Sequence, residues 1–168
     1  MTLTLILIRH AKSDWGTPAL PDYDRPLNDR GRRSAPVLGR WLAERGYGPE
    51  EVILSGARRT VETWEGMAPS VAPAPTVRVE RRLYDAPPER MLAVLREAGA
   101  SPVLVIGHNP GIGEFANRLA IAPPPNPRFA DYPTGATAVF RFLRDAWGDV
   151  GWSEGEVVDF ITPRQLMD

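Results

Sequence analysis

The chain has 168 residues, with 20 Lys or Arg against 21 Asp or Glu and a formal net charge of −1. This length predicts a single domain over residues 1–168, with a core that needs no disulfide or metal to fold. The absence of cysteine excludes a thiolate nucleophile, a Cys-based zinc site and a disulfide framework. The balanced charge gives no basic field for nucleic acid, and no apolar run is long enough to span a membrane. We therefore expect a soluble, cytoplasmic protein.

Six apolar or β-branched residues, 3–8, open the chain and predict a strand buried on both faces of a sheet. Residues 102–107 repeat this pattern, and the runs at 51–55, 136–142 and 157–161 predict further strands. The run 76–79 is more polar and is expected nearer a sheet edge. Amphipathic or capped segments at 28–46, 58–67, 88–98 and 112–119 predict helices between the strands. Such alternation is typical of a three-layer α/β/α sandwich with a mostly parallel sheet.

Three predicted strands end in cationic side chains. Arg9 and His10 follow the first strand, Arg58 and Arg59 follow the second, and His108 follows the strand at 102–107. Because ligands in open α/β sheets bind beyond the carboxyl ends of strands, we expect these groups to converge in one pocket. Arginine forks match phosphate or carboxylate oxygens, so the sequence favours a phosphate ligand.

A histidine in such a pocket can attack phosphorus and form a phosphohistidine intermediate, which splits hydrolysis into two displacements. The surrounding cations can stabilise the transferred group without a cofactor, and two histidines without a carboxylate cluster make a poor metal site. We therefore expect neither a metal nor another cofactor. Neighbouring arginines are expected to disfavour protonation of His10, which keeps a lone pair available for attack.

Several segments resemble a known family. In chain order they are Arg9-His10-Ala11-Lys12-Ser13 with Trp15, Arg25-Pro26-Leu27-Asn28-Asp29-Arg30-Gly31, Leu83-Tyr84, Gly107-His108-Asn109-Pro110-Gly111 and Pro133-Thr134-Gly135-Ala136. Together they are similar to the signatures of the histidine phosphatase superfamily, in its small SixA-like phosphohistidine phosphatase branch. The resemblance implies the phosphoglycerate mutase-like fold and a phosphatase. It also implies that His10 is the nucleophile and that Arg9, His108 and an arginine of the second strand end hold the phosphoryl group.

The second strand end offers two arginines. The family pattern there is Ser-Pro-x-x-Arg-Ala-x-x-Thr, and aligning its ends with Ser55 and Thr63 puts the functional arginine at Arg59. Arg58 is then a solvated surface charge. Gly56 stands where the pattern has proline, so the turn is expected to differ slightly.

The sequence leaves the proton donor and the substrate open. Asn109 occupies one position where related enzymes carry an acid. Asp85 lies near the other, but the interpretation as a solvated aspartate is favoured over that as an acid. A labile P–N bond places less demand on a donor, which favours a protein phosphohistidine, for example on a histidine-containing phosphotransfer protein. Ser13 is a further candidate for substrate binding. The alternatives are a phosphatase of small molecules or of phosphoserine and phosphothreonine, and a phosphate-binding module without turnover.

Overall fold

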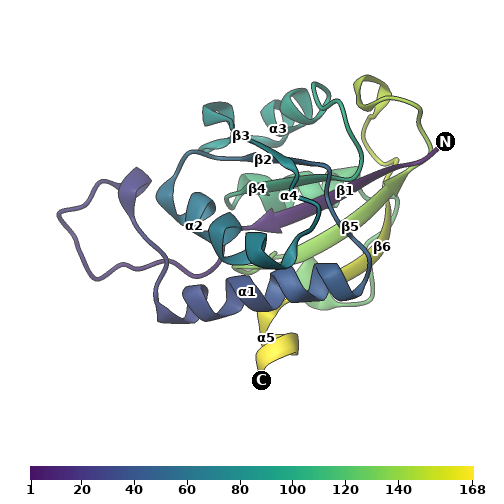
Figure 1. Ribbon diagram of the computed structural model, residues 1–168. Coiled ribbons are helices and arrows are strands. Elements are labelled where there is room, and N and C mark those ends of the chain that lie inside the picture. Colours follow the sequence, from purple (N-terminus) through teal and green to yellow (C-terminus); the bar gives the residue numbers. More distant parts are fainter.

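The computed structural model describes all residues 1–168 and consists of one six-stranded sheet with helices on both faces (Figure 1). The strands are β1 (Leu3–Arg9), β2 (Glu51–Leu54), β3 (Thr76–Val79), β4 (Val103–Gly107), β5 (Thr137–Phe142) and β6 (Glu156–Ile161). The helices are α1 (Asp29–Glu44), α2 (Arg58–Met67), α3 (Pro88–Leu95), α4 (Gly111–Leu119) and α5 (Pro163–Met167). The predicted α/β class and the three layers are confirmed.

The sheet order is β3-β2-β4-β1-β5-β6. The first four strands pair in parallel, whereas β5 and β6 join the sheet antiparallel. β3 lies at the edge, as its polarity predicted. The strands β2, β4 and β1 are neighbours, so their carboxyl ends meet at one side of the sheet. The predicted convergence of three strand ends is therefore correct.

β1 divides the core because successive side chains of a strand point to opposite faces. Leu5 and Leu7 pack with residues of α3 and α4, and Ile6 and Ile8 pack with residues of α1 and α2. All four side chains are fully buried. Full burial of each contributes about 1.5–3 kcal/mol, which explains why this run contains no charged residue before Arg9.

The amino-terminal end of α1 is capped by Asn28 and packs against the segment that follows β1. The Asn28 side chain accepts a hydrogen bond from the Gly31 N–H, and the Asn28 N–H donates to the Lys12 carbonyl. A Cβ at position 31 would collide with that same carbonyl. The Asn-x-x-Gly spacing therefore caps the helix and fixes the segment that follows His10.

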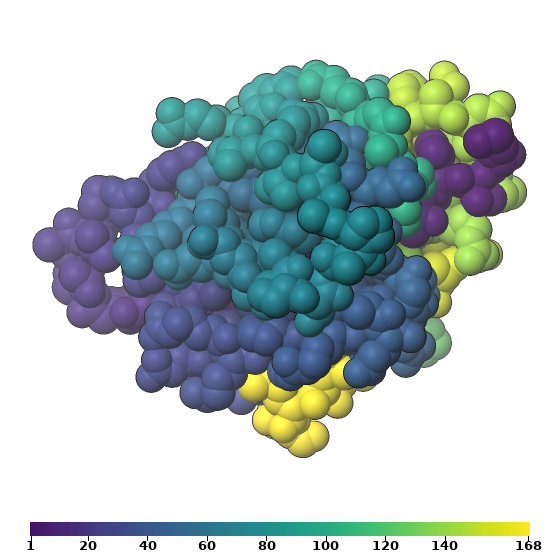
Figure 2. Space-filling view, viewed as in Figure 1, coloured from purple at the N-terminus to yellow at the C-terminus, as the bar shows by residue number.

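The structure differs from the sequence prediction at its carboxyl end. Five residues after β6 form α5, which the sequence analysis did not predict. Thr162 and Gln165 close a capping box at its start, and the helix contacts α1. Figure 2 shows α5, in yellow, protruding beside α1, and the purple segment before α1 projecting at another edge of the molecule. None of the helices has both the length and the apolar composition required to cross a bilayer.

Candidate active site

A cavity of about 370 Å³ lies at the carboxyl ends of β1, β4 and β2. It is lined by Arg9, His10, Lys12, Ser13, Trp15, Asp22, Arg25, Arg59, Asp85, His108, Asn109 and Thr134. All five side chains predicted from the sequence to form the site are among them. We call this cavity the phosphoryl pocket.

His10 is held in one tautomer. The residue is 6% exposed, and its ring Nδ1 lies 2.7 Å from the Ala11 carbonyl oxygen. A carbonyl only accepts, so Nδ1 carries the proton and Nε2 keeps its lone pair. Burial lowers the pKa of His10 to about 3, and the nearby His108, Arg59 and Arg9 lower it further. This is the expected direction, but burial rather than the charge of the arginines is the larger cause.

His108 faces His10, with ring centroids 5.2 Å apart. Its Nε2 lies 2.8 Å from the Ser55 hydroxyl, which also accepts a hydrogen bond from the Ala57 N–H. The serine hydrogen finds an acceptor only if it is donated to Nε2, which puts the ring proton of His108 on Nδ1. That buried Nδ1 has no partner. Burial, followed by the charge of Arg59, lowers the pKa of His108 to about 3.

The two arginines of α2 point to different places. Arg59 is 4% exposed and reaches the pocket, where Nη1 donates to the Asp22 carbonyl at 2.7 Å and Nη2 to the Asp22 carboxylate at 3.0 Å. Arg58 is exposed and pairs with Glu62 along the helix. The assignment of Arg59 to the pocket and Arg58 to the surface is thus correct.

The Arg9 side chain makes one hydrogen bond, in which Nη1 donates to the Tyr132 carbonyl at 3.2 Å. Its Nε and that of Arg59 are buried without a partner. Unpaired buried donors cost free energy in a folded protein, so they are few, and each requires an explanation such as a catalytic role. Both guanidinium groups therefore retain hydrogen-bonding capacity that the free protein does not use.

A third arginine, Arg25, is a site residue that the sequence analysis quoted within a motif but gave no role. It is 7% exposed, its Nη1 donates to the Ser13 hydroxyl at 2.8 Å, and its guanidinium lies 3.5 Å from the centre of the Trp15 ring. Ser13 pairs as an isolated bridge with Leu27, which brings the two segments together. The hydroxyl of Ser13 therefore lies in the pocket and positions Arg25.

Asp22, in the short 3-10 helix η1 (Asp22–Asp24), is the second site residue that the sequence analysis missed. Its carboxylate accepts hydrogen bonds from Arg25, Arg59 and the Tyr84 hydroxyl. Partial burial acts to raise the pKa of Asp22, but the hydrogen bonds from these three groups outweigh it and hold the pKa well below its usual range. The carboxylate is ionised at neutral pH and cannot donate a proton.

Two further lining residues bear on proton donation. Asn109 is committed to the local fold, because its amide donates to the Asp131 and Tyr132 carbonyls and accepts from the Gly113 N–H. Asp85 is exposed, its carboxylate makes no hydrogen bond or ion pair, and its backbone φ is 51°, in the left-handed region. Of the two carboxylates that line the pocket, Asp85 is therefore the one without a side-chain partner.

The arrangement joins a neutral imidazole with an unprotonated Nε2 to several cationic side chains that line the same pocket. No three or more His, Cys, Asp or Glu side chains lie together in a way that could hold a metal ion. Such a site suits transfer of a phosphoryl group to histidine.

Comparison with known proteins agrees with this geometry. Residues 5–87 match the model of the histidine phosphatase superfamily, branch 1. An uncharacterized protein of Mycobacterium tuberculosis is 32% identical over 164 residues, which cover 94% of this chain and all of the relative. The chain belongs to the histidine phosphatase superfamily and is a phosphatase.

Two solved structures resemble the chain over nearly its whole length. The Nakamurella multipartitia protein assigned as a phosphohistidine phosphatase SixA has a TM-score of 0.82 and 29% identity, with 97% of each chain covered. The protein histidine phosphatase SixA in complex with tungstate has a TM-score of 0.74 and 23% identity, covering 98% of this chain and 99% of that one. The latter likeness concerns the fold alone.

Proposed function

We propose that this protein is a metal-independent phosphatase that works through a phosphohistidine on His10 and removes phosphate from protein phosphohistidine. The observation that carries the proposal is the hydrogen bond from His10 Nδ1 to the Ala11 carbonyl, which leaves Nε2 unprotonated beside three arginines. The low pKa of His10, about 3, keeps this lone pair available throughout the physiological range.

In the first displacement, Nε2 of His10 attacks phosphorus while the bond from phosphorus to the leaving nitrogen breaks. The imidazole of a substrate phosphohistidine leaves as a neutral ring when its other nitrogen already carries a proton. Arg9, Arg25 and Arg59 bind the phosphoryl oxygens, and the Nδ1 proton of His108 adds a neutral donor. These groups stabilise the charge of the transition state in place of a metal.

In the second displacement, a water molecule attacks phosphorus and the bond to His10 Nε2 breaks, which releases inorganic phosphate. The attacking water loses one proton. Asp85 accepts this proton in the proposed mechanism, because its carboxylate lines the pocket without another partner. His10 returns to its starting tautomer because the Ala11 carbonyl retains the Nδ1 proton.

A phosphohistidine substrate is supported by the proton inventory of the pocket. Asp22 is held ionised and Asn109 has no acidic proton, so only the exposed Asp85 is left to protonate an alkoxide. A nitrogen leaving group needs less help. The solved relatives assigned as phosphohistidine phosphatases point in the same direction.

The chemistry is tested by trapping ³²P on the protein from a generic phosphate donor. We expect acid-labile label on the wild type and none on His10→Ala. Arg59→Ala is expected to slow labelling about 10²-fold, as for loss of one preorganised donor, whereas Arg58→Ala is its matched control and keeps the wild-type rate. Absence of label on the wild type would favour a phosphate-binding module without turnover.

The substrate is tested separately, by comparing a phosphorylated histidine protein with a panel of phosphate monoesters that includes phosphoserine and phosphothreonine peptides. We expect the highest kcat/KM for the phosphohistidine protein. Faster turnover of any monoester would replace this substrate with a small molecule or a phosphoserine or phosphothreonine protein.

A further inference from the structure

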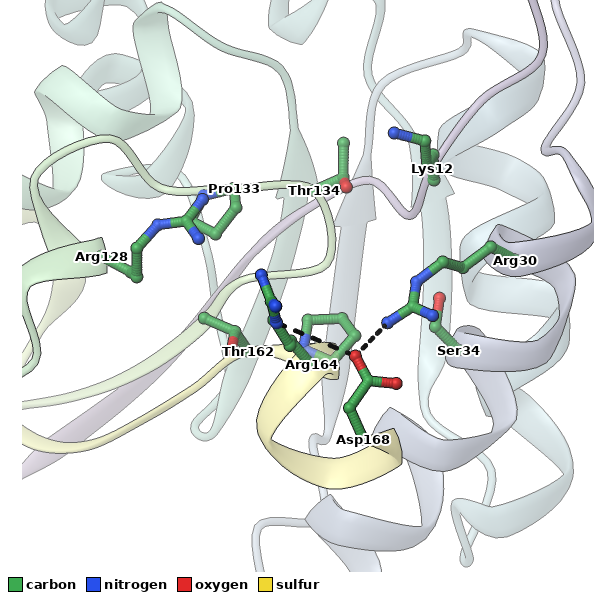
Figure 3. A pocket seen from close by; sticks show the side chains of 10 residues that line it. Lys12, Arg30, Ser34, Arg128, Pro133, Thr134, Thr162, Arg164 and Asp168 are labelled. Carbon is green, nitrogen blue, oxygen red and sulfur yellow. Dashed lines mark hydrogen bonds and ion pairs between the residues drawn. The ribbon is translucent and has the colours of Figure 1, made fainter.

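A second cavity, of about 350 Å³, adjoins the phosphoryl pocket (Figure 3). Lys12 and Thr134 line both cavities. The remaining walls come from α1 through Arg30, from the short helix η4 (Pro127–Phe129) through Arg128, and from α5 through Arg164 and Asp168. We call it the basic cavity. Nothing in the mechanism above uses it.

The basic cavity carries an excess of positive charge. Four cationic side chains line it, those of Lys12, Arg30, Arg128 and Arg164, against the single lining carboxylate of Asp168. The Arg128 guanidinium also pairs with Asp131 outside the lining, which leaves an excess of two positive charges. Its lining includes no hydrophobic residue. Lys12, the only lysine of the chain, is exposed and forms neither a hydrogen bond nor an ion pair through its amine. A cavity with this lining attracts an anion rather than an apolar group.

The Asp168 side chain shows that the basic cavity can hold a carboxylate. One oxygen of Asp168 lies 3.1 Å from Nη2 of Arg30 and 3.9 Å from Nε of Arg164. Figure 3 shows both guanidinium groups directed at this oxygen, with Lys12 and Thr134, which also line the phosphoryl pocket, further along the cavity. The contact to Arg164 is long and that side chain is 79% exposed, so it remains available to a second anion.

The boundary between the two cavities is fixed by backbone contacts. The Lys12 carbonyl accepts from the Asn28 N–H and abuts Gly31, one residue beyond Arg30. On the opposite wall, the Gly135 N–H donates to the carbonyls of Arg9 and His10. The basic cavity is therefore held at a constant place beside the nucleophile.

We propose that the basic cavity binds a second anionic group, a carboxylate or a phosphate, on the same substrate molecule whose phosphoryl group reaches His10. The proposal rests on the proposed function for the place of the phosphoryl group. It adds that the substrate carries two anions, and that the second one contributes to recognition without taking part in the chemistry.

The test measures binding without turnover. Alkylphosphonates are compared with ω-phosphonocarboxylates of the same chain length, over a series of increasing length, by calorimetric titration of the whole protein. In the wild type, we expect the carboxylate to strengthen binding about three- to fivefold at the length that spans both cavities, as for one exposed ion pair. Equal affinity with and without the carboxylate at every length would overturn the proposal.

Charge-changing variants assign the effect to the basic cavity. Arg164→Glu is expected to abolish the carboxylate advantage and to leave alkylphosphonate binding unchanged, and Asp168→Asn is expected to increase the advantage. Arg40→Glu, at an exposed position of α1 outside both cavities, is the matched control and keeps it. Equal loss in Arg40→Glu and Arg164→Glu would show a general charge effect and overturn the proposal.

Two further arms distinguish the source of the anion and separate this proposal from the proposed function. Peptides that carry a non-hydrolysable phosphohistidine analogue next to glutamate are compared with the same peptides carrying glutamine at that position. Alkane-α,ω-bisphosphonates are compared with the corresponding monophosphonates. A glutamate advantage identifies an acidic segment of a phosphoprotein, and a bisphosphonate advantage alone identifies a small substrate. Carboxylate-dependent binding without ³²P labelling would support the second anion site and refute the phosphatase mechanism. Labelling of His10 without carboxylate-dependent binding would support the mechanism and refute the second anion site.

Discussion

Thr63 offers a direct test of how the fold holds the nucleophile in place. Its side chain is fully buried in α2, and its hydroxyl accepts a hydrogen bond from the Ala11 N–H at 3.0 Å and donates to the Arg59 carbonyl at 2.7 Å. The same Ala11 residue presents the carbonyl that fixes the His10 tautomer. Thr63 therefore links the two residues proposed to attack and to bind the phosphoryl group.

Thr63→Val keeps the volume of the side chain and removes the hydroxyl. The Ala11 N–H is then buried without a partner, which costs about 1–3 kcal/mol. For a chain of this size, each kcal/mol lowers Tm by about 2–4 °C. We also expect phosphorylation of His10 to slow about tenfold, because a loosened Ala11 peptide no longer holds the imidazole in the attacking geometry.

The assay combines denaturant unfolding with the rate of ³²P labelling, and Thr63→Ser is the matched control. Serine keeps the hydroxyl and loses one methyl group, at a cost of about 1 kcal/mol, so we expect it to be labelled at the wild-type rate. The reasoning is refuted if Thr63→Val matches the wild type in both measurements, or if Thr63→Ser is labelled as slowly as Thr63→Val.

Three other predictions concern charge in the phosphoryl pocket. Burial lowers the pKa of His10 and His108 to about 3 from an ordinary 6.5, so the unfolded chain binds more protons between these values. The free energy of unfolding is therefore expected to fall as the pH drops from about 6.5 toward 3, by up to about 1.4 kcal/mol per pH unit for each histidine. Urea titrations at several pH values measure this slope, and His108→Asn is expected to reduce it. A slope that is the same in His108→Asn and in the wild type would contradict the prediction. Asp85→Asn is expected to slow the labelling of His10 by alkyl phosphates about 10²-fold or more while sparing its labelling by phosphohistidine, and equal slowing of the two labelling reactions would exclude a leaving-group role. Asp22→Asn removes a negative charge beside Arg59, so inorganic phosphate is expected to inhibit about fivefold more strongly, as for one ion-pair contribution near 1 kcal/mol, and weaker inhibition would show that Asp22 chiefly positions the arginine.

The sheet could be predicted from the sequence where a strand is buried on both faces. Apart from Thr4 and Arg9 near the two ends of β1, the residues of β1 and β4 are apolar or glycine, and such a run is expected only at a central place in the sheet. The direction of β5 and β6 could not be derived in the same way, since an apolar run reads identically in parallel and antiparallel pairing. α5 was missed because five residues are too few to show a helical period.

The site residues likewise divide into those that could be predicted from the local sequence and those that could not. His10 and His108 follow the two central strands directly, so their position in the chain fixes their position in space. Asp22 and Arg25 lie in an aperiodic segment whose path depends on contacts with Ser13, Arg59 and other distant groups. Nothing in the local sequence of that segment encodes those contacts.

The missed residues change how the charge of the phosphoryl pocket is understood. Arginines alone suggest a strongly cationic pocket, but four cationic and two carboxylate side chains line it, and both histidines are neutral at physiological pH. The excess of two positive charges equals the charge of a phosphate dianion. A larger excess would hold the product phosphate more tightly without a matching gain in the transition state, because substrate, intermediate and product carry the same phosphoryl charge. The Asp22 carboxylate that engages Arg59 and Arg25 in the free protein is thus consistent with an enzyme that must release phosphate as well as bind it.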